Sequence, residues 1–418
     1  MQESPIITYV ETRSFGHYPV WVRAVVQAFC RLRPAARLHV WVSRDFRSAH
    51  REWAEQYFGS LESAAVHFAC YETLFASPTG YAPVARLPEE IEIIHNCVRV
   101  DKSCVCYIAY LDGQLRNIAL GRFNRLRSKL VGVLDQPYLH YREFENPALP
   151  SGFTWATLVK ARVVHFAAAH RRVIGRILMG DPMAPAYHRR ALGSEKFQFL
   201  PEPFSAIPPS IYPRRSLSLP EDRILLLFIG STEKRKGICQ LLSALEVVLS
   251  ENAGFERQIS LVLAGRVIDE TRVTVEKQIA RLRRNFPGFT IAEHNRFLTE
   301  QEFADFLTAS DVVCMPYITM VGTSGVLTHA VHAARIVLAS NFGITGELVR
   351  RYKLGVVCNS TEGSSLRRGL IEAIEMAKSK GATDRVDRDG FLGYCTASFE
   401  EVGEAIVNHL MEIGGINR

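Results

Sequence analysis

Short apolar runs alternate with amphipathic stretches in the first 200 residues. Ile6 to Val10 is apolar and β-branched, residues 14–17 interrupt it, and Pro19 can open a helix that continues through Phe29. Leu38 to Val42 then reads as a second strand. This strand–helix–strand rhythm predicts a parallel sheet with right-handed crossovers. Further buried strands are predicted at residues 104–111, 130–134 and 163–168.

A second and clearer series of the same kind begins near residue 222. Its predicted strands are residues 223–229, 259–264, 289–292, 311–315 and 336–339. The helices predicted between and after them are residues 237–249, 274–284, 300–309, 325–334 and 366–377. Regular alternation of this kind is typical of a doubly wound α/β domain, whose ligands bind at the carboxyl ends of the strands.

The two series predict an α/β protein of two Rossmann-like domains with parallel sheets facing a cleft. A chain of 418 residues is long for one core. Two prolines in the segment Phe199–Pro203 favour a stiff, extended connector. We therefore expect an N-terminal domain over residues 1–203 and a C-terminal domain over residues 204–397. A last helix, within residues 398–418, is expected to pack back on the first domain.

Composition narrows the class of protein without naming a reaction. Hydrophobic residues make up 47% and charged residues 22%, which excludes a disordered chain, and a net charge of +7 is too mild to predict a nucleic-acid partner. The nine cysteines are scattered without metal-ligand spacing, as in reduced cytoplasmic proteins. We expect no signal peptide and no membrane-spanning segment. No bound metal is expected either.

The first candidate site follows the predicted strand at 223–229. Residues 230–237 read GSTEKRKG and place Lys234, Arg235 and Lys236 beside a helix N-terminus. Exposed amides and the helix dipole add to the charge of the three cations, which suits anionic oxygens. The same pattern also fits a solvated basic turn.

A second candidate loop follows the predicted strand at 311–315 and opens the next helix. Its two glycines let the backbone approach a ligand closely, and consecutive amides at a helix start can bind a phosphate. A plain helix cap is the other interpretation. A third loop, after residues 259–264, offers a glycine and an arginine, the latter also readable as an ordinary surface residue. The residues of these two loops are Gly322, Thr323, Ser324, Gly325, Val326 and Leu327, and Gly265 and Arg266.

The motifs FIGSTEKRKGICQLLSAL, LVLAGRV, FLTEQEFADFLTASDVVCMPY and TSGVLTHAVHAARIVLASNFG occur in this order. Together they resemble the nucleotide-binding half of the retaining glycosyltransferases of family 4, which have the GT-B fold. The likeness covers about residues 222–375, and the N-terminal half matches only in architecture. The resemblance implies that Lys236 and the amides of residues 322–327 contact the donor diphosphate. It also implies that the loop containing Gly16 closes over the donor.

Three positions depart from the family pattern. Ser231 stands where the family has an arginine, so that Arg235 or Lys234 would supply the charge. Val321 and His329 stand where the family has two glutamates, one for the ribose and one for the sugar. We keep Ser231 and His329 among the expected donor contacts. The resemblance implies a nucleotide-sugar donor, UDP- or GDP-linked, and no other cofactor.

His17 is a separate hypothesis. It lies next to Gly16 between a predicted strand and helix, where inverting GT-B enzymes place a catalytic base, and its pKa range suits proton transfer from an acceptor hydroxyl. It could instead contact donor or acceptor, or cap the helix. His95, after the apolar run 91–94, and Asp112, after the strand at 104–111, are weaker candidates at strand ends.

Five cations lie between Arg116 and Lys129, with apolar residues at helical spacing among them. This pattern fits a solvated helix face, or a basic amphipathic helix resting on an anionic membrane.

The combined prediction is a cytoplasmic glycosyltransferase of the hexosyltransferase type, with possible membrane association. It transfers a sugar to a hydroxyl of a small molecule, glycan or lipid-linked sugar, with retention and without metal. The alternatives are a non-catalytic glycosyltransferase-like subunit, an inverting enzyme using His17, and a GT-B epimerase or phosphorylase.

Overall fold

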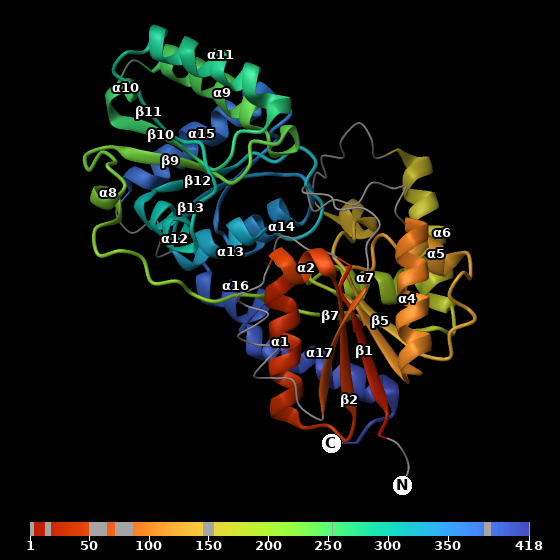
Figure 1. Ribbon diagram of the computed structural model, residues 1–418. Coiled ribbons are helices and arrows are strands. Elements are labelled where there is room, and N and C mark those ends of the chain that lie inside the picture. The colour runs from red at the N-terminus through yellow and green to blue at the C-terminus, as the bar shows by residue number, and fades with distance from the viewer. Residues whose placement is uncertain are drawn as a thin grey trace. The chain divides into compact units, whose positions relative to one another are not determined.

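The computed structural model describes residues 4–12, 18–49, 65–71, 87–144, 154–252, 254–379 and 386–417. The chain divides into two compact units (Figure 1). Unit 1 consists of Met1–His140, Thr154–Pro203 and Ala397–Arg418, and unit 2 of Tyr141–Phe153 and Phe204–Thr396. Each unit is built around one parallel sheet covered by helices, as predicted for Rossmann-like domains.

Unit 1 contains a seven-stranded parallel sheet in the order β3-β2-β1-β4-β5-β6-β7. Because the order reverses between β1 and β4, the switch point of the sheet lies between these two strands. The strands are β1 (Ile6–Val10), β2 (Arg37–Ser43), β3 (Val66–Tyr71), β4 (Val105–Ile108), β5 (Lys129–Leu134), β6 (Ile174–Met179) and β7 (Phe197–Phe199). The helices are α1 (Tyr18–Leu32), α2 (Arg44–Ala49), α4 (Leu87–Asp101), α5 (Leu115–Ala119), α6 (Trp155–His170), α7 (Ala184–Leu192) and α17 (Phe399–Gly414). The 3₁₀ turn η2 (Leu139–Glu143) begins in unit 1 and continues into unit 2 at Tyr141.

The C-terminal helix α17 packs against α1 in unit 1. A capping box at Ser398 starts it, and its buried residues Val402 and Ile406 share one core with Ile7 and Val25. At Gly403 a side chain would collide with the backbone carbonyl of Ala24, so a glycine allows the two helices to approach this closely.

Three predictions for the first half are wrong. Residues 163–168 are not a strand but the second half of α6, a sixteen-residue helix capped by Thr154. The run before His95 is likewise helical, within α4, so His95 is not at a strand end. Residues 116–129 form no continuous helix, since α5 ends at Ala119 and Gly121 has φ +77°. Short apolar runs do not separate helix from strand by pattern alone.

Unit 2 contains a six-stranded parallel sheet in the order β11-β10-β9-β12-β13-β14, with its switch point between β9 and β12. All five strands predicted here are confirmed, and β14 is added. The strands are β9 (Ile224–Ile229), β10 (Ile259–Ala264), β11 (Thr290–His294), β12 (Val312–Met315), β13 (Ile336–Ser340) and β14 (Gly355–Cys358). The helices are α8 (Pro213–Ser216), α9 (Ile238–Glu251), α10 (Phe255–Gln258), α11 (Asp269–Asn285), α12 (Glu300–Ala309), α13 (Gly325–His332), α14 (Gly343–Arg351), α15 (Gly363–Lys378) and α16 (Arg388–Cys395), with the turn η3 (Lys234–Lys236).

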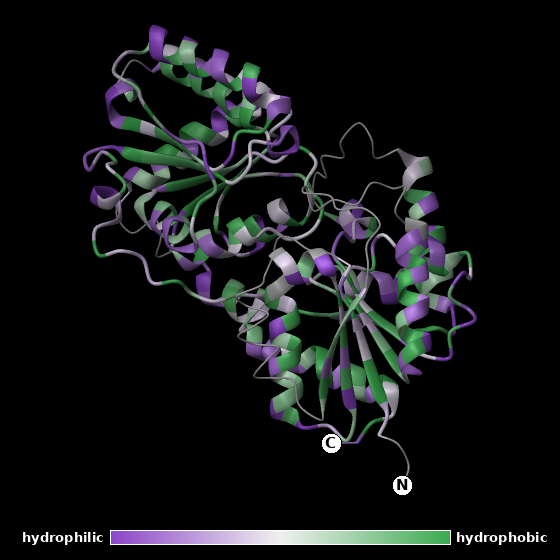
Figure 2. Cartoon of the chain, in the orientation of Figure 1, coloured by the Kyte–Doolittle hydropathy of each residue, from purple (hydrophilic) through white to green (hydrophobic). Residues whose placement is uncertain are grey.

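The central strands of both sheets are mostly hydrophobic, whereas polar residues interrupt β2, β3 and β11 toward the sheet edges (Figure 2). Parallel sheets are expected to be buried on both faces at their centre. In unit 2 every residue of β10, β12 and β13 is buried. This rigid interior fixes the strand ends, and the loops that leave those ends carry the candidate site.

Candidate functional site

The cationic loop and the loop before α13 leave adjacent strands at the switch point of unit 2. Their backbones are joined, because the carbonyl of Arg235 accepts a hydrogen bond of 2.7 Å from the amide of Ile318. Crevices at such switch points are the usual ligand sites of doubly wound sheets. The fold therefore brings together two of the three loops predicted from the sequence, and β10 adds the third beside β9.

Two glycines allow these loops to pack so closely. Gly237 has φ +74°, and a side chain there would collide with the carbonyl oxygen of Pro316. Gly265 has φ +130°, and a side chain there would collide with the carbonyl oxygen of Gly230. A residue with a Cβ would push the loops apart in both places, so these glycines shape the site whether or not they contact a ligand.

Lys236 ends the turn η3 with its ammonium next to Gly230. The Nζ atom lies 2.9 Å from the position that a Cβ of residue 230 would occupy. Burial lowers the pKa of Lys236, the nearby carboxylate of Glu233 raises it, and the charge of Arg235 lowers it further. Among the described residues no side chain or carbonyl forms a hydrogen bond or ion pair with this ammonium. A desolvated cation without a partner favours an anionic ligand.

Glu233 holds the remainder of the cationic loop in place. Its carboxylate accepts a hydrogen bond from Ser231 Oγ at 2.6 Å and forms an ion pair with Arg235. Burial raises the pKa of Glu233, but the bonds from Ser231 and Arg235 and the charges of Arg235 and Lys236 lower it overall. Ser231 and Arg235 thus have an internal partner, while Lys234 is exposed. Of the two lysines without a partner in the described residues, Lys236 is the one that is partly buried, so its charge gains most from a ligand.

The start of α13 offers two backbone donors. The amide of Leu327 is used by the Ser324 carbonyl at 2.9 Å, whereas the amides of Gly325 and Val326 have no partner within the described part of the chain. Nothing lies within 4 Å of where a Cβ of Gly325 would be, so this helix end opens on free space. Ser324 itself lies 3.5 Å, between hydroxyl oxygens, from Tyr317. Thr323 precedes it in the same loop.

The amide of Gly322 is occupied. It donates a 3.0 Å hydrogen bond to the hydroxyl of Tyr141, which is buried in unit 2 and packs edge-on against Phe342. A residue from the first half of the sequence therefore anchors the loop, and no sequence pattern pointed to it. The expected contact of the Gly322 amide with a ligand would require this bond to break.

Other predicted residues lie around the loops. The guanidinium of Arg266 lies 5.6 Å from the ring centre of Phe297, and its carbonyl accepts from the amide of Thr232. The ring of His329 lies between those of Phe204 and Phe303, at 4.9 and 5.1 Å. His329 therefore sits in an aromatic cluster on the side of α13 that faces α12. Gly16 and His17 lie outside the described residues.

The carboxyl edge of the sheet in unit 1 has a different character. Asp112, after β4, accepts 2.8 Å hydrogen bonds from the amides of Asp135 and Gln136, after β5. Burial, together with the charge of Asp135, raises the pKa of Asp112 to about 7 against the effect of those amides. A carboxyl group with such a pKa is a candidate acid, base or hydroxyl ligand.

Two buried histidine contacts lie near the same edge and were not predicted. His140 Nε2 is 2.9 Å from a carboxylate oxygen of Asp181, and His165 Nδ1 is 3.2 Å from His188 Nε2. Burial lowers the pKa of His165 to about 3 and that of His188 to about 4. Asp181 lies two residues after the end of β6, and a strand-end position of this kind could have marked it as a candidate. Asp181 was missed because the pattern of the sequence did not predict β6.

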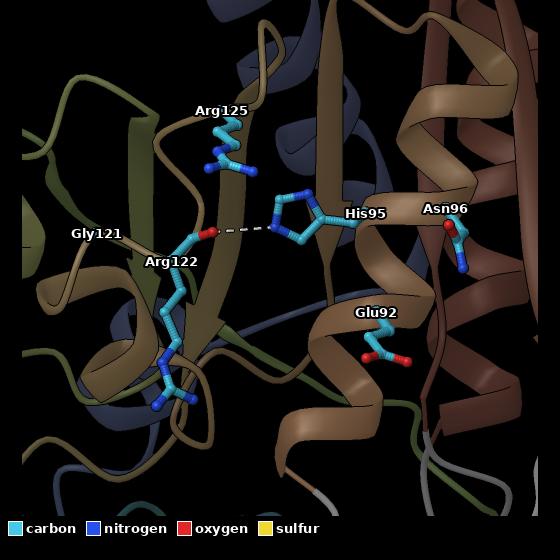
Figure 3. A pocket seen from close by; sticks show the side chains of 6 residues that line it. All are labelled: Glu92, His95, Asn96, Gly121, Arg122 and Arg125. Atoms are coloured by element: carbon cyan, nitrogen blue, oxygen red, sulfur yellow. Dashed lines mark hydrogen bonds between the residues drawn. The ribbon is translucent and has the colours of Figure 1, made fainter.

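His95 lies on α4 and lines a hollow of about 650 Å³ together with Glu92, Asn96, Arg122 and Arg125 (Figure 3). Its Nε2 atom is 3.1 Å from the carbonyl oxygen of Arg122, and its ring stacks on Phe123. His95 thus braces the loop after α5 and lies away from the strand ends.

Within the described ranges, no group of three or more histidine, cysteine, aspartate or glutamate side chains is placed to hold a metal ion. In the same ranges, no helix is both long enough and apolar enough to cross a bilayer.

Residues 213–385 match the family model described as glycosyl transferases group 1. No curated protein matches the chain in sequence. Among solved structures, the N-terminal domain of Candida albicans trehalose-6-phosphate phosphatase aligns with a TM-score of 0.67 and 11% identity, covering 98% of this chain and 97% of that one. Sucrose-phosphate synthase from Thermosynechococcus elongatus aligns at 0.65 and 14%, covering 98% and 99%.

A third similar structure is the Anabaena protein HepE in complex with UDP and glucose, with a TM-score of 0.61, 14% identity and coverage of 98% and 100%. At such identities the structures establish the fold alone, and the family model adds the class of domain. Residues 213–385 therefore form a domain of the group 1 glycosyl transferase type, and the chain has the GT-B fold.

Proposed function

We propose that this enzyme binds a nucleoside diphosphate sugar at the switch point of unit 2 and transfers the sugar to an acceptor hydroxyl. The observation that carries the proposal is the partly buried ammonium of Lys236, which has no partner in the described residues. It lies on a loop bonded to the loop that opens α13, where the amides of Gly325 and Val326 also have no partner in the described ranges. A diphosphate would satisfy both kinds of donor at once.

A UDP-sugar is the first donor to test. The Anabaena protein HepE was solved with UDP and glucose, and an E. coli protein of the same fold was solved with UDP-2-fluoro glucose. These ligands belong to those proteins, and they guide the choice of probe here. A GDP-sugar is the second choice.

The chemistry that this site supports is stabilisation of a leaving group. As the glycosidic bond to the diphosphate breaks, negative charge develops on the phosphate oxygens, and preorganised donors at Lys236, Gly325 and Val326 would stabilise it. We further propose that these donors make a divalent metal unnecessary. Retention of the anomeric configuration rests on the resemblance to family 4.

The acceptor is proposed to bind at the carboxyl edge of unit 1. Carboxylates that follow adjacent strands, here Asp112 and Asp135, can accept hydrogen bonds from sugar hydroxyls. This assignment leaves the acceptor class open to small molecules, glycans and lipid-linked sugars.

The experiment is a thermal-shift screen with UDP-, GDP-, ADP- and dTDP-sugars, repeated on Lys236→Met and Lys234→Met. A ligand that binds the native state increases the free energy of unfolding, by about 2.7 kcal/mol when its concentration is a hundred times Kd. The melting temperature rises as a result. We expect one nucleotide to shift wild type and Lys234→Met but not Lys236→Met. No shift with any nucleotide, or equal shifts in both variants, would refute the donor site.

A non-catalytic subunit is the second candidate, favoured by Val321 and His329 in place of two glutamates and by the packing of His329 between aromatic rings. Release of free UDP or GDP from a binding sugar donor, measured with the isolated protein, separates the two. Turnover excludes the subunit, whereas binding without turnover supports it.

A further inference from the structure

Helix α6 exposes a continuous apolar stripe. Trp155, Val159, Val163 and Phe166 recur at intervals of four, four and three residues, which places them on one side of the helix. Their exposed fractions are 68%, 42%, 60% and 50%. Four large apolar side chains in a row on one helix face are unusual on a soluble surface, where such residues are normally scattered.

A second, largely apolar side of α6 is already buried. Leu158, His165, Ala168 and Ala169 are buried where the helix packs against α5 and α7. The outer stripe is therefore not needed for the core of unit 1. A helix that is apolar on both sides is expected to have its second side covered as well.

The surroundings of the stripe are cationic. Residues 115–129, 154–173 and 184–194 contain eleven lysines and arginines and no aspartate or glutamate. The nearest acids in sequence are Glu195, which forms an ion pair with Arg189, and Asp112 and Asp181, which precede α5 and α7. The whole chain carries a net charge of only +7, so charge is concentrated here rather than spread evenly. The eleven residues are Arg116, Arg122, Arg125, Arg127, Lys129, Lys160, Arg162, Arg171, Arg172, Arg189 and Arg190.

The stripe ends at a cationic hollow of about 530 Å³. His170 joins the two, since it lines the hollow and its ring lies against that of Phe166, tilted by 31° with centres 4.2 Å apart. Arg127 and Arg172 also line the hollow, and their guanidinium groups have no partner among the described residues. No acidic residue lines it, in contrast to the hollow of Figure 3, which includes Glu92.

We propose that the α6 surface, meaning the stripe and this hollow together, docks on an anionic lipid bilayer. The stripe would enter the headgroup region with Trp155 at the interface, and the hollow would hold lipid phosphate groups. Charge favours this occupant over a second copy of the chain, because two such surfaces would repel each other. The loop after α5 supplies cations, but the apolar face belongs to α6.

The test is sedimentation of the full chain with vesicles of phosphatidylcholine alone, or with about 30% phosphatidylserine. We expect binding to the anionic vesicles, little binding to the neutral ones, and weakening as NaCl is raised from about 0.1 to 0.5 M. Inorganic phosphate at equal ionic strength serves as the soluble competitor. If phosphate releases the protein more effectively than matched salt, a free-anion site replaces the bilayer proposal.

Variants separate the two parts of the surface. Val163→Ser with Phe166→Ser should weaken binding to anionic vesicles at least tenfold, because the apolar contact is lost. Arg127→Ala and Arg172→Ala should weaken it about fivefold each. Matched controls come from α11, where Val273→Ser and Arg284→Ala alter an equally exposed valine and an exposed arginine of unit 2.

A second readout does not depend on variant stability. Trp155 is one of four tryptophans. The tryptophan emission of wild type should shift to the blue on adding anionic vesicles and be partly quenched by brominated lipid, and Trp155→Phe should remove both changes. Vesicle binding that survives the α6 variants, no binding to anionic vesicles at about 0.1 M NaCl, or a stripe-dependent dimer in light scattering would overturn the proposal. Nucleotide binding should not change in these variants, so this failure is distinct from failure of the donor site.

Discussion

The carboxyl edges of the two sheets share a strand order but differ in chemistry. In unit 2 the loops at the switch point present the cation Lys236 and two helix amides that have no partner among the residues the structure describes. In unit 1 the corresponding edge presents Asp112 and Asp135, with a buried histidine–aspartate pair close by. One topology thus carries the proposed diphosphate site in one unit and the proposed acceptor site in the other, since the loops and not the strands supply the chemistry.

The largest expected effect concerns the cationic edge. Lys236→Met should lower the rate of sugar transfer about 10²- to 10³-fold, because one preorganised donor to the leaving group is lost. Lys234→Met, on the same turn but exposed, should stay within about threefold of wild type, as rim charges contribute little. Initial rates with a saturating nucleotide sugar measure both. Equal losses in the two variants would mean that general charge matters and position does not.

Glycine substitutions test whether loop packing shapes this edge. Gly237→Ala should lower the melting temperature by about 2–10 °C, because the new Cβ meets the Pro316 carbonyl and residue 237 has a positive φ. Gly325→Ala meets nothing within 4 Å and should keep its stability, yet weaken nucleotide binding by filling the space above the free amides. Calorimetric unfolding and nucleotide titration together decide. A stable Gly237→Ala with full affinity would contradict the packing argument.

The carboxylate edge should show itself in the dependence of stability on pH. The pKa of Asp112 is raised to about 7, so between about pH 4 and 7 the folded state binds more protons than the unfolded state. This contribution therefore stabilises below about pH 4 and is lost as pH rises through 7. Asp112→Asn should remove this contribution. The melting temperature of the variant minus that of wild type should therefore increase by a few degrees between pH 5 and pH 8. A pH-independent difference would argue against a raised pKa.

The smallest effect is expected from the buried histidine contact. The pKa values of His165 and His188 are lowered to about 3 and 4, so the unfolded state binds more protons between about pH 4 and 6.5 and acid destabilises the fold. His165→Phe should flatten the loss of melting temperature over this range, by about 1–3 °C. Matched scans at pH 7 and pH 4.5 check this. An unchanged slope would mean that the ring stays accessible.

Sequence reasoning worked best where local pattern and fold agree. In unit 2, buried β-strands alternate with amphipathic helices that have one apolar face. The first and last residues of β10 and α12 were predicted correctly. In α6 the apolar residues occupy both sides, which hid the helical period and suggested a strand at 163–168. The same property that misled the prediction is the basis of the proposed docking surface.

The site shows a similar division. The loop containing Lys236 and the start of α13 could be located from strand ends, glycines and charge. The bond between Tyr141 and Gly322 could not, because 181 residues separate the partners and no local pattern marks either. The Asp112 carboxylate was noted only as a strand-end residue, since its raised pKa comes from burial and, secondarily, from the charge of Asp135, and both depend on the fold.

The central claim is that the switch point of unit 2 recognises a diphosphate. Calorimetric titration with UDP and UMP, and with GDP and GMP, tests it most directly. The account predicts that one diphosphate binds about ten- to a hundredfold more tightly than its monophosphate, as expected for an added charge-assisted bond, and that Lys236→Met abolishes the difference. Equal affinity for the two, or a preference for diphosphate that persists in Lys236→Met, would contradict it.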